Sequence, residues 1–157
     1  MDLPTCSIAS QYIMTMHSPL DAPQKVASDL EIYNARSGGW VKGPSIEGRI
    51  ISPSGDWLRY LPNGTAKLDA RFSILADDGS IIYASYSGRV SGYEKALERR
   101  RPGEALRADD AYVIICPTFE TLSSKYGWLN EIVCIGKLTS ARDDEDNHVT
   151  YEVFAIS

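Results

Sequence analysis

The chain has 157 residues, 43% of them hydrophobic and 24% charged, a composition typical of a globular protein with one sizeable core. Its formal net charge of -5 excludes a general nucleic-acid binder, because such proteins need a basic surface. No apolar run approaches the roughly 18 residues that a membrane-spanning helix requires. The N-terminus lacks the charged and apolar regions of a signal peptide, and the three cysteines show no close pairing. We therefore expect one domain, residues 1–157, that is cytoplasmic and has no nucleic-acid or membrane partner.

Short strands and turns dominate the N-terminal third of the sequence. Residues 5–16 and 30–33 have strand patterns, with two prolines between them, and residues 49–52 form a further short strand. Several glycines, among them Gly43 and Gly48, punctuate the region before residue 49. Glycines inside strands often mark bulges or the corners of a barrel, so this region favours a strongly bent sheet.

The clearest local pattern is a β-meander over residues 56–87. Two turn signals, Asn63-Gly64 and Asp78-Gly79, separate three runs of alternating polarity. These dipeptides favour positive φ at both centres of a two-residue hairpin turn. The middle strand has an apolar face of Leu68, Ala70, Phe72 and Ile74, and a polar face of Lys67, Asp69, Arg71 and Ser73.

The C-terminal half continues with strands around one helical segment. Residues 93–101 contain good helix formers and are followed by Pro102-Gly103. Strands are predicted at 112–116, stopped by Pro117, at 129–138, and at 149–156 after an acidic turn. Turn signals every 8–12 residues or so, without βα alternation, predict an all-β fold. We expect a single-domain antiparallel β-barrel of about eight or more strands with a short helical insertion, and a β-sandwich is the alternative.

Sequence motifs for cofactor binding are absent. There is no phosphate-binding loop, dinucleotide fingerprint or nucleophile elbow. The two histidines, His17 and His148, are far apart in sequence, and a histidine-rich metal site needs more ligands than these. We therefore expect neither a metal nor a cofactor.

Asp69 and Arg71 form the first candidate constellation. On a strand they lie on one face, roughly 6–7 Å apart. If that face is exposed to solvent, they are an ordinary surface ion pair. If it lines a barrel lumen, Asp69 requires a partner, and Arg71 can stabilise an enolate or carboxylate while Asp69 orients it. The sequence leaves both readings open, and under the second these two residues are the candidate catalytic pair.

A second group combines amphipathic aromatic side chains with an amide. Tyrosine and tryptophan bring apolar bodies with polar atoms, a combination that suits a small-molecule pocket. The alternative is structural, with Trp128 in the core and Asn130 capping a turn. The candidate substrate-binding residues are Trp57, Tyr60, Tyr83, Tyr126, Trp128 and Asn130.

An ordered set of motifs over about residues 38–154 resembles a known family. The motifs are Gly38-Gly39, Gly43-Pro44, Gly48, Asp56-Trp57, Pro62-Asn63-Gly64, Leu68-Asp69-Ala70-Arg71, Asp78-Gly79, Ile82-Tyr83, Pro117-Thr118-Phe119-Glu120-Thr121, Tyr126-Gly127-Trp128-Leu129-Asn130 and Tyr151-Glu152-Val153. On these residues the chain resembles the UPF0311 family, also described as domain of unknown function 3237. The resemblance implies an antiparallel β-barrel and supplies no established activity. The family often has an arginine in the strand before Pro117; residues 112–116 have none, which implies a more apolar ligand here.

These observations favour a β-barrel that binds a small organic molecule. The first hypothesis is a cofactor-independent isomerase, cyclase or lyase acting in the lumen on an apolar or aromatic substrate of the secondary-metabolite type. One alternative is a non-catalytic carrier of a small aromatic or lipid-like ligand, and another is a structural module with a filled barrel. A homodimer is compatible with the sequence.

Overall fold

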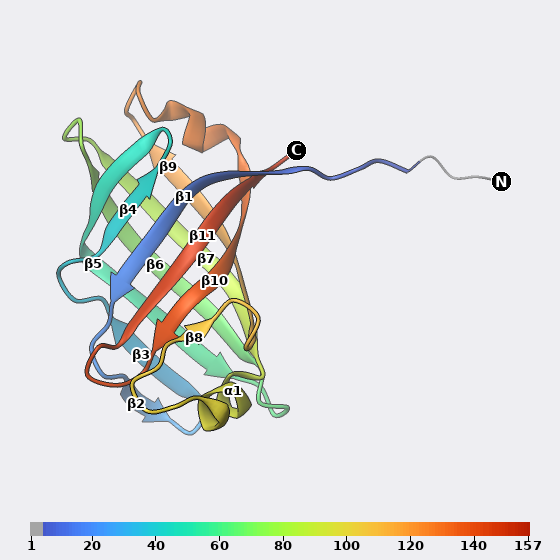
Figure 1. Ribbon diagram of the computed structural model, residues 1–157. Coiled ribbons are helices and arrows are strands. Elements are labelled where there is room, and N and C mark those ends of the chain that lie inside the picture. The colour runs from blue at the N-terminus through green and yellow to red at the C-terminus, as the bar shows by residue number, and fades with distance from the viewer. Residues whose placement is uncertain (1–4) are drawn as a thin grey trace.

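The computed structural model describes residues 5–157, which form a closed antiparallel β-barrel with one short α-helix (Figure 1). Among the described residues, eight strands form the barrel wall, in the order β5-β4-β1-β11-β10-β9-β7-β6, and β6 pairs again with β5. This second pairing closes the sheet, so the predicted barrel is confirmed and the sandwich alternative is wrong. The strands of the wall are β1 (Ser10–Pro19), β4 (Trp40–Gly43), β5 (Ile46–Tyr60), β6 (Ala66–Ala76), β7 (Ile81–Ser91), β9 (Tyr112–Thr121), β10 (Val133–Arg142) and β11 (His148–Ile156).

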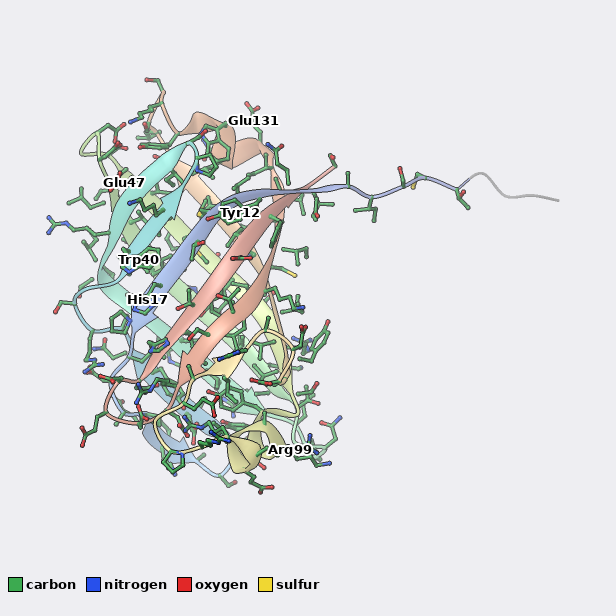
Figure 2. All side chains as sticks on the ribbon, in the orientation of Figure 1. Tyr12, His17, Trp40, Glu47, Arg99 and Glu131 are labelled. Atoms are coloured by element: carbon green, nitrogen blue, oxygen red, sulfur yellow. The ribbon has the colours of Figure 1, made fainter. Side chains whose placement is uncertain are left out.

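The remaining elements lie at the two ends of the barrel. β2 (Gln24–Ala27) pairs with β3 (Leu30–Asn34), which extends the wall by pairing with the second half of β5. The helix α1 (Tyr93–Arg99) lies at the same end as β2 and β3, and the short strand β8 (Leu106–Arg107) pairs with β10. The 3-10 helix η1 (Gly127–Glu131) lies at the opposite end, as the labels Arg99 and Glu131 show in Figure 2.

The predicted meander is present as β5, β6 and β7, but its turns differ from the expectation. Gly64 and Gly79 have positive φ angles of 81° and 84°, whereas no residue other than glycine has a positive φ among the described residues. The predicted positive φ at Asn63 and Asp78 is therefore wrong. Each loop has three residues, with hydrogen bonds from Leu61 N–H to the Thr65 carbonyl and from Ala76 N–H to the Ser80 carbonyl. A three-residue loop needs the left-handed conformation at its last position only, which glycine supplies.

Several predicted boundaries also shift. β1 begins at Ser10 rather than residue 5, residues 49–52 belong to the longer β5, and residues 127–131 form η1 before β10 starts at Val133. β9 continues through Pro117 to Thr121. Pro117 pairs with Tyr86 of β7, and β10, which pairs with β9 only at Ile114 and Ile115, needs no N–H at position 117. Residues 1–4, on which the expectation of a missing signal peptide partly rests, lie outside the described residues.

The inward face of the wall is apolar, as the alternation in the meander predicts. β6 contributes Leu68, Phe72 and Ile74 to the interior, all 7% exposed or less. Ile115 of β9 and Val153 of β11 are fully buried and pack in the same cluster. Ile74, Ile115 and Val153 thus fill one part of the barrel interior, whereas Leu68 and Phe72 border an open space in the rest. No helix among the described residues is long and apolar enough to cross a membrane.

Candidate functional site

A cavity of about 460 Å³ occupies the half of the barrel interior next to α1. Most of its wall is aliphatic or aromatic carbon, from residues such as Met16, Leu58, Leu68, Phe72 and Leu138. Polar side chains interrupt this apolar wall, among them the Asp56 carboxylate and the tyrosines Tyr33, Tyr60, Tyr86, Tyr93 and Tyr151. Charged side chains border the cavity where α1 and the end of β10 meet it: Glu94, Lys95, Arg142 and Asp143.

Strand β5 directs Asp56 into the cavity. The pairing of β5 with β6 shifts register between Ile51 and Ser54, an irregularity that re-aims the strand after it. Because side chains alternate along a strand, Asp56, Leu58 and Tyr60 then share the inward face, and all three border the cavity. An acidic residue therefore lies on the inward face of β5, two positions from the apolar Leu58.

Two hydrogen bonds hold the Asp56 carboxylate. Tyr86 Oη donates to Oδ2 over 3.1 Å, and the backbone N–H of Asp69 donates to Oδ1 over 3.2 Å. No ion pair involves Asp56 among the described residues. The carboxylate is thus oriented by neutral donors on β6 and β7 and lacks a compensating positive charge.

This environment makes Asp56 a weak acid. Burial raises its pKa to about 6 from the ordinary 3.8, and the hydrogen bonds from Tyr86 and Asp69 only partly oppose that rise. The small repulsion from the Asp69 carboxylate acts in the same direction as burial. A carboxyl group with a pKa near 6 exists in both protonation states close to neutral pH, so it can both accept and donate a proton.

Tyr86 and Tyr151 complete a polar row beside Asp56. Their rings lie 5.8 Å apart, and Tyr86 also meets Phe72 edge-on at 6.1 Å between ring centroids. Burial, with the adjacent Asp56 charge, raises the pKa of both tyrosines well above the usual value. Both hydroxyls therefore stay protonated at neutral pH, so each has one proton to donate, which Tyr86 directs at Asp56, and lone pairs that can accept a hydrogen bond.

The mouth of the cavity lies beside α1. Tyr93 and Leu97 of α1 border the cavity together with Arg142 and Asp143 from the end of β10 and the loop after it. Arg100, which follows the helix, forms an ion pair with Asp143 and has only 15% of its side chain exposed. This ion pair joins the α1 segment to the barrel rim.

The structure places Asp69 and Arg71 outside the lumen. They form the expected pair, with 3.5 Å between Asp69 Oδ1 and Arg71 Nη2, but 60% and 58% of their side chains are exposed. They border only a shallow depression on the outer surface. The expectation that they face a cavity with Tyr83 and Asn130 is wrong, because the apolar face of β6 takes the interior and its polar face must point to solvent.

Among the other predicted binding residues, only Tyr60 borders the cavity. Trp57 and Tyr83 lie on the outer face, with 39% and 38% exposure. Tyr126 is buried at the opposite end of the barrel, where its hydroxyl donates to Asp77.

Trp128 and Asn130 belong to η1, also at that opposite end. Trp128 packs against the core, and Asn130 exchanges hydrogen bonds with the backbone N–H and carbonyl of Thr121 at 2.8 and 2.9 Å. The structural alternative, core packing and capping, describes these two side chains.

The sequence analysis missed Asp56, Tyr86 and Tyr151 as site residues. A signal for Asp56 was available, since it lies two and four residues before Leu58 and Tyr60 and thus on the same face of one strand. Tyr86 likewise shares one face of its strand with Ile82 and Ala84, which are fully buried. An acidic or phenolic side chain on the same strand face as buried apolar residues indicates a polar group that points into the barrel.

The two histidines, expected to be isolated, are neighbours on the outer face of the barrel. Their ring centroids lie 5.1 Å apart, and His17 also stacks on Trp40 (Figure 2). His17 Nδ1 contacts Thr150 Oγ1, and both ring nitrogens of His148 have hydrogen-bond partners. Over residues 5–157, no three histidine, cysteine, aspartate or glutamate side chains gather as a metal site would require.

The fold and the cavity define a class of protein: a closed β-barrel whose half-filled interior holds a half-buried acid beside tyrosines. The family model for the protein of unknown function DUF3237 matches residues 8–156, and the chain belongs to this family. A UPF0311 protein of Rhodopseudomonas palustris strain TIE-1 is 30% identical over 106 residues, which are 68% of this chain and 69% of that protein. A UPF0311 protein of Clostridium acetobutylicum is 33% identical over 91 residues, 58% of each chain.

Solved structures share the barrel. A protein of unknown function from Clostridium acetobutylicum superposes with a TM-score of 0.82 at 23% identity, covering 98% of this chain and 100% of that one. A β-barrel-like protein from Acinetobacter baumannii gives a TM-score of 0.77 at 26% identity, with 99% and 100% coverage. A chain described as an enzyme from Penicillium herquei gives 0.66 at 18% identity, with complete coverage of both chains. At this identity, the third likeness shows the fold alone.

Proposed function

We propose that this protein is a proton-transfer enzyme of the isomerase or cyclase class, acting without a cofactor on an apolar or aromatic organic substrate inside the barrel. The observation that carries the proposal is Asp56, a half-buried acid with a pKa of about 6 on the wall of a largely apolar cavity. Enclosed cavities with few convergent polar groups and a perturbed pKa are typical of active sites. The enzyme among the structural neighbours adds that this barrel supports catalysis in one protein.

In this proposal Asp56 performs both proton transfers. Its carboxylate removes a proton from an acidic C–H or O–H group of the substrate, and the protonated acid returns that proton to another atom of the same molecule. In an isomerisation the substrate bond that breaks and the one that forms are thus both bonds to hydrogen. In a cyclisation the deprotonated atom adds to a C=C or C=O π bond of the same molecule, which is consumed as the ring C–O or C–C bond forms, and Asp56 returns the proton to the other atom of that π bond. Tyr151 supplies a neutral donor for the oxygen on which negative charge develops, while Tyr86, whose proton is directed at Asp56, orients the carboxylate.

The test is turnover by the purified protein, assayed with a panel of polyfunctional aromatic substrates and no added cofactor. Asp56→Asn should lower kcat at least about 100-fold, the usual contribution of a general acid–base group. Tyr86→Phe should lower kcat less and shift the acidic limb of the pH–rate profile upward, because the Tyr86 hydrogen bond lowers the Asp56 pKa. Trp57→Phe, on the outer face, is the matched control.

Two results would contradict the proposal. One is an Asp56→Asn variant with wild-type turnover. The other is ligand binding with no chemical change, which would instead support the alternative of a carrier for a small aromatic or lipid-like molecule.

A further inference from the structure

A second polar group of side chains lies at the mouth side of the cavity, separate from Asp56. Tyr60 Oη donates to Glu31 Oε2 over 3.0 Å, and Tyr33 Oη donates to the same oxygen over 3.4 Å. Tyr33 and Tyr60 border the cavity. Glu31 faces the same side of β3 as Tyr33, since the two are alternate residues of one strand.

Glu31 fixes the direction of both tyrosine hydroxyls. A tyrosine hydroxyl has one proton, and both Tyr33 and Tyr60 use that proton to donate a hydrogen bond to Glu31. What each phenol oxygen can still offer is a lone pair. Burial, with the Glu31 carboxylate, raises the pKa of both tyrosines well above the usual value, so the hydroxyls remain neutral. This part of the wall therefore accepts hydrogen bonds.

The two polar groups are separated along one strand. Asp56 and Tyr60 are four residues apart on the inward face of β5, a spacing of about 13 Å between their Cα atoms. The wall between them carries Leu58, and Leu68 and Phe72 border the same cavity. A ligand that meets both groups has polar atoms near its two ends and an apolar body.

We propose that Tyr33 and Tyr60, held by Glu31, recognise a hydroxyl group of the substrate at the end remote from Asp56. This inference rests on the proposed function, because it takes Asp56 as the reacting end. It specifies the substrate class: an apolar or aromatic scaffold with a second hydroxyl that donates to the phenol oxygens. Glu31 is a positioning residue here, since it acts through the two tyrosines.

The experiment compares two probes, 4,4′-dihydroxybiphenyl and 4-hydroxybiphenyl, by isothermal titration. The diol should bind wild-type protein about tenfold more tightly than the mono-ol, the ratio that one additional hydrogen bond supports. In the double variant Tyr33→Phe/Tyr60→Phe this ratio should fall to about two or less, while the mono-ol still binds, which also reports an intact cavity. Glu31→Gln should lower the ratio only where Tyr33 and Tyr60 are present. Tyr83→Phe, an exposed tyrosine, is the control.

An unchanged ratio in the double variant would overturn the inference, as would a wild-type protein that binds neither probe or prefers the mono-ol. Tighter wild-type binding of 4′-hydroxybiphenyl-4-carboxylate than of the diol would also overturn it, because that result would indicate recognition of an anion by Arg142 or Lys95 at the mouth. Binding is measured without turnover. An Asp56→Asn variant that keeps both turnover and the probe ratio would therefore refute the proposed catalysis and leave this site standing.

Discussion

Asp56 brings an ionisable group into a cavity without a positive partner, and this arrangement affects folding as well as chemistry. The folded protein raises the Asp56 pKa from 3.8 to about 6, so between these values the folded state binds more protons than the unfolded state. The corresponding stability is complete below about pH 4 and is lost as the pH rises through 6. The ionised carboxylate is therefore a cost at neutral pH.

We expect Asp56→Asn to remove this pH dependence. Between pH 4 and pH 7 the free energy of unfolding of the wild type should fall by up to about 3 kcal/mol relative to the variant, the equivalent of the pKa shift. Urea unfolding at a series of pH values measures both curves. Parallel curves for the two proteins would show that Asp56 is solvated like a surface aspartate.

Arg71, unlike Asp56, is a charged residue on the outer surface, where its partner Asp69 is also exposed to solvent. Arg71→Met should change the free energy of unfolding by less than about 0.5 kcal/mol, because exposed ion pairs contribute little. Turnover or ligand binding should remain at the wild-type level. Thermal unfolding and the activity assay check the two outcomes together, and a loss of more than about 2 kcal/mol would contradict the outward placement of the side chain.

At the scale of elements, the segment with α1 is joined to the barrel rim by few specific contacts. It begins and ends near two glycines with positive φ, Gly92 at 73° and Gly103 at 78°. The ion pair of Arg100 and Asp143 is the main polar link that we see to the rim among the described residues. Local stability of such a segment depends strongly on that link.

Asp143→Asn should therefore expose the α1 segment to trypsin. The Arg99–Arg100 and Arg100–Arg101 bonds should be cleaved several-fold faster, roughly fivefold for a loss of about 1 kcal/mol. Mass spectrometry of timed digests measures the rate. Asp69→Asn is the matched control, since it breaks the exposed Arg71–Asp69 pair on the outer face of β6. Equal rates in both variants would mean that packing of α1, rather than the ion pair, holds the segment.

At the scale of the whole molecule, closure of the barrel brings backbones too close together for side chains at certain strand positions. A Cβ atom on Gly43, at the end of β4, would lie 2.0 Å from the carbonyl oxygen of Ile13 in β1. A Cβ atom on Gly88 would lie 2.5 Å from the Ile114 carbonyl oxygen. The strands can meet at these points only because glycine leaves the space empty.

Gly43→Ala should lower the free energy of unfolding by about 2–4 kcal/mol, because β1 and β4 must separate to admit the methyl group. Chemical denaturation measures the loss. Gly127→Ala in η1 is the control, since nothing lies within 4 Å of the added atom, and its effect should stay within about 0.5 kcal/mol. A Gly43→Ala protein as stable as this control would refute the close approach.

Most of the fold could be predicted from the sequence because its signals are local. The alternation of Leu68, Ala70, Phe72 and Ile74 with polar residues requires only neighbouring side chains to interpret, and the glycines at 64 and 79 mark turns wherever the strands lie. The family motifs pointed to the same barrel. The strand through Pro117 was misjudged because the cost of a missing N–H depends on which neighbouring strands pair there, and only β7 does so at Pro117, which is a tertiary property.

The candidate site depended on information that only the tertiary structure supplies. The sequence determined that Asp69 and Arg71 share a face, but it did not determine which face of β6 is enclosed when β6 pairs with β5. Closure turned the polar face to solvent, and it brought Asp56, Tyr86 and Tyr151 from three strands around one cavity. The pKa of Asp56 has the same origin, since burial arises from side chains distant in sequence. Periodicity is a property of one strand, whereas a lumen exists only when eight strands close around it.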